Sequence, residues 1–182
     1  AVVASADAGK DGKYRLRMDS ALIERVYGWA RANGAILFLD VQPGLSSVME
    51  ELPKLSRFLE RPDVHLGIDP EFNMRNFKDT IPPGKQIGQL TATEINYSID
   101  FLAKLVASKQ LPPKVLVVHR FRQAMVRDAA SIRLNPNVQV VMHMDGWGVP
   151  TVKFGSYQRY ILPEPVQFTG FKLFYRHDTQ LG

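Results

Sequence analysis

Short apolar runs recur along this chain, and most of them end abruptly in a charged or polar residue. Six segments share the pattern: residues 1–6, 35–42, 64–72, 114–121, 138–148 and 170–178. Runs of this length, bounded by Gly, Pro, Asn or Asp, predict strands buried in a sheet. This repetition constrains the fold more than any single motif in the chain does.

Segments of helical length separate most of these runs. Asp19 or Ser20 can cap a helix that stops at Asn33-Gly34, and Thr91 with Glu94 forms a capping box that opens the clearest helix. Further helices are predicted over residues 47–59, with Pro53 in the first turn or at a kink, and over residues 122–134. Residues 73–89 read as a long loop of the kind found at active sites, and residues 149–166 have no clear periodicity.

Strands that alternate with helices indicate successive right-handed βαβ units and therefore a parallel sheet. Continuous apolar strands favour a sheet that is covered on both faces. An open doubly wound sheet and a barrel both fit. Polar residues lie at the C-terminal ends, or tips, of at least five strands. This favours a barrel, because the functional residues of a doubly wound sheet gather at one switch point. These tips are Asp40, Asp69, His119, His143 and His177.

The predicted fold class is therefore α/β, with a parallel, TIM-like (β/α) barrel. A complete barrel takes about 250 residues. The chain has 182 residues and six visible strands, so we expect a partial or distorted barrel, or a fragment of a longer one. Residues 1–182 would form a single domain.

Composition narrows the range of partners. No apolar run reaches the roughly 18 to 20 residues of a membrane span. The net charge is +5, but the 23 Lys and Arg are scattered among 18 acidic residues, so we predict no nucleic-acid partner. The chain lacks Cys, which suits either the cytoplasm or a bacterial exterior. Because it begins at Ala1 inside an apolar run, we expect a processed protein, secreted or associated with the cell envelope.

The strongest catalytic candidates follow the third apolar run, where Asp69 and Glu71 flank Pro70. Side chains two residues apart in an extended segment project to the same side, so two carboxylates meet there. Glycoside hydrolysis requires one carboxylic acid with a raised pKa and a second carboxylate. We predict Glu71 as the general acid, Asp69 as its electrostatic support, and Asp40 or Asp145 as base or nucleophile.

Aromatic and polar residues near the other strand ends are candidates for substrate binding. Trp147 lies between two glycines directly after a strand tip, where it either stacks against a sugar ring or packs as an ordinary loop residue. The remaining candidates for contact with a carbohydrate or another small polar substrate are His119, His143, Tyr175, His177 and Asp178.

The Asp69-Pro70-Glu71 tip resembles the D-x-E strand end of the chitinase-like glycoside hydrolase barrels. The resemblance implies that Glu71 acts as the acid and that Asp69 assists an acetamido group of the substrate. That family's fuller motif has further aspartates where this chain has Gly67 and Val64, so the likeness covers one strand end. The whole chain is also similar to uncharacterised bacterial barrel proteins of the secreted or lipoprotein type, which implies no particular activity.

Two alternatives stay open on the sequence. One is a metal-dependent hydrolase in which His119, His143, His177 and the carboxylates hold an ion such as zinc, although neither H-x-H nor H-E-x-x-H occurs. The other is a carbohydrate-binding barrel without catalysis. Phosphate-binding loops and the G-x-S-x-G elbow are absent, which disfavours nucleotide chemistry and serine hydrolysis. The glycosidase hypothesis requires no cofactor and no metal.

Overall fold

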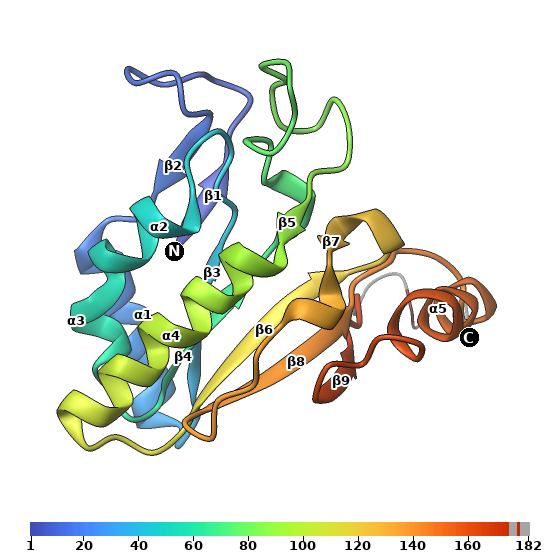
Figure 1. Ribbon diagram of the computed structural model, residues 1–182. Coiled ribbons are helices and arrows are strands. Elements are labelled where there is room, and N and C mark those ends of the chain that lie inside the picture. Colours follow the sequence, from blue (N-terminus) through green and yellow to red (C-terminus); the bar gives the residue numbers. More distant parts are fainter. Residues whose placement is uncertain (175–177, 179–182) are drawn as a thin grey trace.

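A seven-stranded, mostly parallel sheet forms the centre of the protein (Figure 1). The structure is a computed structural model, and it describes residues 1–174 and residue 178. The only antiparallel pair in this sheet is β1 with β2, and a small second sheet pairs β5 (Leu90–Thr91) with β7 (Val126–Arg127). The large sheet has the order β2 (Arg15–Arg17), β1 (Val2–Ala4), β3 (Leu37–Val41), β4 (Val64–Ile68), β6 (Lys114–Arg120), β8 (Val138–Met144) and β9 (Phe168–Phe171).

The predicted barrel is wrong, because this sheet is open. Its edges are β2 and β9, and the two are not paired with each other. In this respect the protein is like the open sheets of Rossmann-like and flavodoxin-like folds. The parallel strands β1, β3, β4, β6, β8 and β9 nevertheless lie side by side in chain order. Strands in sequential order place their C-terminal ends next to one another even though the sheet does not close into a barrel. The polar residues at these ends are therefore compatible with an open sheet as well as with a barrel.

Helices form where the caps predict them. Asp19 caps α1 (Ser20–Ala32), and the reciprocal capping box of Thr91 and Glu94 opens α4 (Ala92–Lys109). The helix predicted over residues 47–59 is broken at Pro53 into α2 (Val48–Glu51), a 3₁₀ segment (Leu52–Leu55) and α3 (Ser56–Leu59). Proline cannot donate its backbone to a helical hydrogen bond, which explains the interruption.

The helix predicted over residues 122–134 does not form. Two 3₁₀ turns (Gln123–Met125 and Ala129–Ser131) flank β7 there, because Val126 pairs with Leu90 and Asp128 adopts a left-handed backbone conformation. The unassigned residues 149–166 contain α5 (Pro150–Ser156) followed by a π-helical turn (Tyr157–Ile161).

The two faces of the sheet differ in burial, which corrects the expectation that both are covered. Helix α4 packs on β6 and β8, and α3 packs on β4, so Leu39, Leu116 and Val140 on this face are buried. Register places Phe38, Asp40 and their cross-strand neighbours on the opposite face. Phe38 remains 39% exposed there. The second face is therefore free to carry polar side chains and a site.

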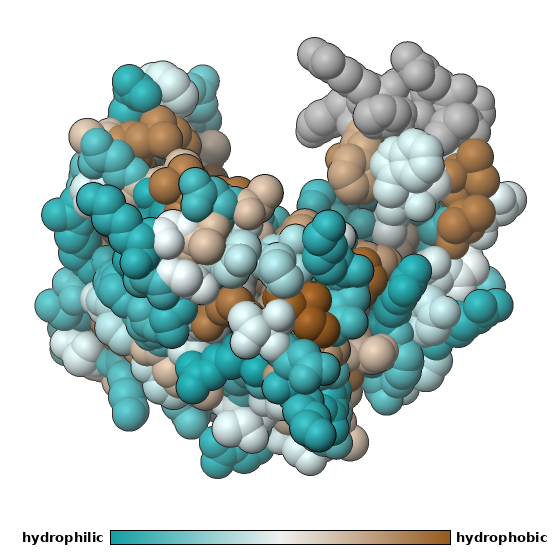
Figure 2. All heavy atoms as spheres, turned by 90° about the horizontal axis from the view of Figure 1, so that it is seen from above, coloured by the Kyte–Doolittle hydropathy of each residue, from teal (hydrophilic) through white to brown (hydrophobic). Residues whose placement is uncertain are grey.

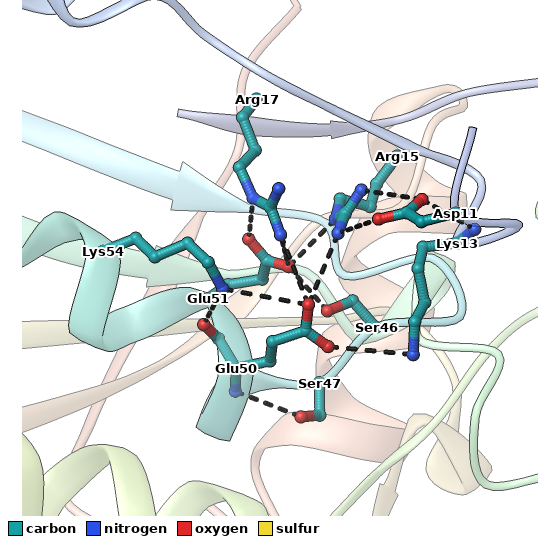
Figure 3. Close-up of polar contacts among 9 residues, drawn as sticks. All are labelled: Asp11, Lys13, Arg15, Arg17, Ser46, Ser47, Glu50, Glu51 and Lys54. Atoms are coloured by element: carbon teal, nitrogen blue, oxygen red, sulfur yellow. Dashed lines mark hydrogen bonds and ion pairs between the residues drawn. The ribbon is translucent and has the colours of Figure 1, made fainter. Parts of the chain in front are cut away.

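A cluster of ion pairs joins the β1–β2 hairpin to α2 (Figure 3). Arg15 Nε lies 2.9 Å from Glu51 Oε1, and Arg17 Nε lies 2.6 Å from Glu51 Oε2. Ser46 also donates a hydrogen bond of 2.6 Å to the Glu51 carboxylate, whose side chain is fully buried. Burial alone would raise the pKa of Glu51, but the hydrogen bonds from Arg17, Ser46 and Arg15 outweigh it and lower that pKa to about 2.

We expect Glu51→Gln to destabilise the protein by about 3 kcal/mol, because it leaves the buried guanidinium of Arg15 without its fully buried charged partner. The folded-state pKa of Glu51 lies below its ordinary 4.5. Its contribution is therefore complete above pH 4.5 and is lost as the pH falls toward about 2. Urea unfolding of wild type and variant at several pH values measures both effects.

Glu50→Gln is the matched control, since this neighbour is 37% exposed and its pairs should contribute about 0.5 kcal/mol. Equal losses for the two variants would contradict the argument.

Candidate active site

The candidate site lies on the less covered face of the sheet, where the parallel strands end. His119 on β6 and His143 on β8 are direct register partners, and Asp40 on β3 is opposite Gly67 on β4. Asp69 follows the last residue of β4 directly. Neighbouring parallel strands that end together thus bring residues from distant parts of the sequence to one edge.

His119 forms the centre of this group. Its Nε2 lies 3.4 Å from Asp40 Oδ1, and its Nδ1 lies 3.2 Å from Asp145 Oδ2. Burial would lower the pKa of His119, but its hydrogen bonds and charge interactions with Asp145 and Asp40 raise that pKa to about 10. His119 is therefore an imidazolium at neutral pH, held between two carboxylates.

The two carboxylates respond in the opposite sense. Burial alone would raise the pKa of Asp40 and of Asp145, but the hydrogen bond and charge of His119 hold both pKa values below their ordinary range. Lys172 adds to the effect on Asp145, because its Nζ lies 2.9 Å from Asp145 Oδ1. Asp145 is thus a buried, ionised carboxylate with two cationic neighbours.

Two glycines make room for these side chains. A Cβ atom on Gly67 would lie 2.5 Å from Asp40 Oδ1, and one on Gly170 would lie 3.0 Å from His143 Cδ2. His143 reaches His119 through their Nδ1 atoms, 3.5 Å apart. Burial, and then the positive charge of His119, lower the pKa of His143, although a backbone interaction with Phe171 opposes them. The neutral form of His143 is therefore favoured next to a charged His119.

Asp69 and Glu71 form the second part of the site. Asp69 accepts hydrogen bonds from Gln42 Nε2 and from the backbone N–H of Glu71, both at 3.0 Å. Burial raises the pKa of Asp69. Burial also raises the pKa of Glu71, and the charges of Asp69 and Asp145 add to this rise. Within the part of the chain that the structure describes, no residue donates a hydrogen bond to the Glu71 carboxylate.

These groups border a cavity of about 600 Å³. Figure 2 views the molecule from the side on which the parallel strands end and shows a surface hollowed between two raised parts. Trp147 lines the cavity and is 64% exposed. The cavity wall combines ionisable side chains with aromatic ones: Asp69, Glu71, Arg122, Asp145 and Lys172 with Phe72, Phe121, Trp147, Tyr160 and Phe174.

The structure brings together most of the residues singled out from sequence. Glu71, Asp69, Asp145 and Trp147 line the cavity, while Asp40, His119 and His143 lie beside it on the same face of the sheet. Asp178 is elsewhere: it accepts a hydrogen bond of 2.6 Å from Lys153 and borders a separate, apolar cavity. Tyr175 and His177 lie outside the described residues.

Sequence reasoning missed the cations of the site, Lys172 and Arg122, and the aromatic residues Tyr160 and Phe174. Lys172 directly follows β9, and its backbone N–H continues the parallel ladder to Met144. A correct register for the last strand would have placed it opposite Asp145. Arg122 and Tyr160 carried no comparable signal, because their segments were read as a helix or left unassigned.

A metal centre receives no support from the geometry. Among residues 1–174 and 178, no three His, Asp or Glu side chains are grouped so that they could hold an ion. The ring nitrogens of His119 instead face Asp40 and Asp145, and His65 Nδ1 accepts a hydrogen bond from the backbone N–H of Val115. The same described residues include no helix long and apolar enough to cross a membrane.

Comparisons with models of protein families, with curated proteins and with solved structures found no match for this chain.

We expect the ring of His119 to remain protonated through neutral pH, and that of His143 to titrate below 6.5. The folded-state pKa of His119 is raised, so its contribution to stability is complete below about pH 6.5 and is lost as the pH rises toward about 10. NMR titration of the histidine rings measures the pKa values directly. Comparing unfolding of wild type and His119→Gln across this pH range isolates the stability effect. A titration midpoint near 6.5 for His119 would show that Asp40 and Asp145 do not stabilise its charged form.

Gly67→Ala should push the Asp40 carboxylate away from His119, because the new Cβ would lie 2.5 Å from Asp40 Oδ1. We expect the pKa of His119 to fall toward its ordinary value and the protein to lose about 1 kcal/mol of stability from overpacking. The control is Gly28→Ala in α1, where an added Cβ has no neighbour within 4 Å. That variant should be more stable by about 0.5 to 1 kcal/mol. An unchanged His119 pKa in Gly67→Ala would show that Asp40 does not act on it.

Proposed function

We propose that the protein is a glycoside hydrolase-like, carbohydrate-processing enzyme in which Glu71 is the general acid. The observation that supports the proposal most is that two carboxyl groups of one cavity have pKa values shifted in opposite directions. The pKa of Glu71 is raised by burial and by its acidic neighbours, whereas that of Asp145 is lowered despite burial by His119 and Lys172. Such a divided pair is what acid-assisted cleavage of a glycosidic bond requires.

Glu71 is suited to protonating a leaving oxygen. Its carboxyl group lines the cavity and has no hydrogen-bond donor among the described residues, so a substrate oxygen can approach it. Asp69 supports this role in two ways: it accepts the Glu71 backbone N–H, which holds the turn, and its charge raises the pKa of Glu71.

Asp145 is suited to stabilising positive charge on the sugar ring. It stays ionised through its contacts with His119 and Lys172, yet it lines the same cavity as Glu71. Asp40 does not line this cavity, so in this proposal it holds the charge of His119 rather than acting as base or nucleophile. His119 and His143 likewise act behind the cavity wall.

The aromatic side chains of the cavity suit a carbohydrate. Sugar rings present apolar C–H faces that stack against Trp, Tyr and Phe, while their hydroxyl groups bond to carboxylates and amides. Trp147 offers an exposed ring at the cavity, and Phe72 follows Glu71 directly. This juxtaposition of stacking surface and acid favours a glycan over a small, wholly polar metabolite.

We expect Glu71→Gln to lower turnover of a responsive glycan by about 10² to 10⁴-fold, the usual contribution of a general acid. The melting temperature should stay nearly unchanged, because no described residue depends on the Glu71 carboxylate for a hydrogen bond. Wild-type turnover should also fall as the pH rises through the raised pKa of Glu71. A reducing-end assay over a panel of oligosaccharides measures these effects.

Glu60→Gln is the matched control, since Glu60 pairs with Lys109 on the helical side, at 3.1 Å. This variant should retain full turnover. A large loss of stability in Glu71→Gln would make Glu71 a structural residue. Tight glycan binding by the wild type without turnover of any glycan would make the protein a binding module.

A further inference from the structure

One cation of the cavity wall, Arg122, has no charged partner among the residues that the structure describes. Arg122 lines the cavity and is exposed, and no described carboxylate lies within ion-pair distance of its guanidinium. Lys172 and His119 differ in this respect, because each is paired with Asp145, at 2.9 and 3.2 Å. The unmatched charge is thus on the side of the cavity that a ligand can reach.

The backbone of Arg122 is held in place although its side chain is unpaired. Its carbonyl oxygen accepts hydrogen bonds from Arg120 Nε and from the Met125 backbone N–H, at 3.4 and 3.2 Å. Arg120 itself is fully buried and pairs with Glu164 at 2.7 Å. Arg122 therefore projects from a fixed turn.

We propose that the substrates of this site are acidic saccharides, and that Arg122 binds the carboxylate of a sugar acid next to Glu71. This inference rests on the proposed function and names its substrate class. A guanidinium presents two parallel N–H donors that match a carboxylate, so it recognises this group better than it recognises a hydroxyl. The aromatic wall accepts the ring of the same sugar.

The acidic residues of the cavity do not oppose such a ligand. Asp145 is neutralised by Lys172 and His119. The pKa values of Asp69 and Glu71 are raised, so either group takes up a proton more readily beside a bound anion than an ordinary carboxylate would. An arriving carboxylate can therefore pair with Arg122 on the exposed side of the cavity.

Binding of the carboxylate would also prepare the acid. The charge of Arg122 lowers the pKa of Glu71. A substrate carboxylate paired with Arg122 cancels this effect and adds a negative charge nearby, so Glu71 holds its proton more firmly when an acidic sugar is bound. A neutral sugar would leave the lowering effect of the Arg122 charge in place.

The test compares each acidic oligosaccharide with its methyl ester, which keeps the sugar and removes the charge. Oligomers of galacturonate, mannuronate and glucuronate serve as probes, with affinity followed by calorimetry and turnover by the reducing-end assay. We expect the wild type to bind at least one acid about tenfold more tightly than its ester. Added salt should reduce this preference.

Arg122→Gln should bind acid and ester equally, and Arg122→Lys should retain part of the preference, because lysine keeps the charge but not the paired donors. Arg133→Gln is the matched control: it removes the same charge where Arg133 pairs with Asp100 of α4, at 3.2 Å. This variant should keep the full preference.

Equal affinity of the wild type for acids and esters would overturn the substrate class, as would a preference that survives in Arg122→Gln. A third outcome is that neutral glycans are cleaved as efficiently as acidic ones and that this cleavage requires Glu71. The proposed function would then stand, and the role of Arg122 would be wrong. If no glycan, acidic or neutral, binds or is cleaved, both fall together.

Discussion

The charge balance around His119 is the interaction on which the site depends. An imidazolium between Asp40 and Asp145 is stable only because both carboxylates stay ionised, and both stay ionised because the imidazolium is there. Lys172 strengthens this mutual dependence, since it forms an ion pair with Asp145 and its charge also lowers the pKa of Asp40. Asp69 and Glu71 form no ion pair among the described residues, so burial outweighs the charge of His119 near Asp69 and of Lys172 near Glu71, and their pKa values rise. Direct ion pairing thus divides the four acids into two chemical classes.

This division depends in turn on the fold. Parallel strands in chain order bring the ends of β3, β4, β6 and β8 to one edge, so residues more than a hundred positions apart in the sequence meet there. The less covered face of the sheet leaves space for ionisable side chains at the strand ends, although Asp69, His119 and Asp145 are themselves buried there. Gly67 and Gly170 extend this space at the two points where a methyl group would press on Asp40 or His143. The helix-covered face contains the hydrophobic core, and the less covered face holds the residues of the candidate site.

Much of this arrangement was accessible from the sequence, and the failures have physical causes. Apolar runs located five of the parallel strands, and caps at Asp19 and Thr91 located α1 and α4, because both signals are local. The run over residues 170–178 overlaps β9 only at Gly170 and Phe171, because that strand ends at Phe171. Closure of the sheet is not local: six strands in sequence order read the same in an open sheet as in a barrel. The supposed helix over residues 122–134 failed because strand pairing of Val126 with Leu90 overrode its periodicity. The carboxylates and histidines were found because strand ends reveal them, whereas Lys172 and Arg122 were missed because nothing in their own segments marks them.

The missed residues bear most directly on specificity. Carboxylates such as Glu71 and Asp145 can serve a glycan of any charge, since every glycosidic bond needs the same acid and the same stabilising charge. Arg122 on the cavity wall has no counter-ion among the described residues, so it discriminates between ligands by charge. A neutral ligand leaves its charge to water, whereas an anionic ligand pairs with it. The identity of the reaction and the identity of the substrate are therefore carried by different residues here. The first set lies at strand ends and can be read from sequence, while the second lies in the irregular segment after β6 and becomes visible only in the folded protein.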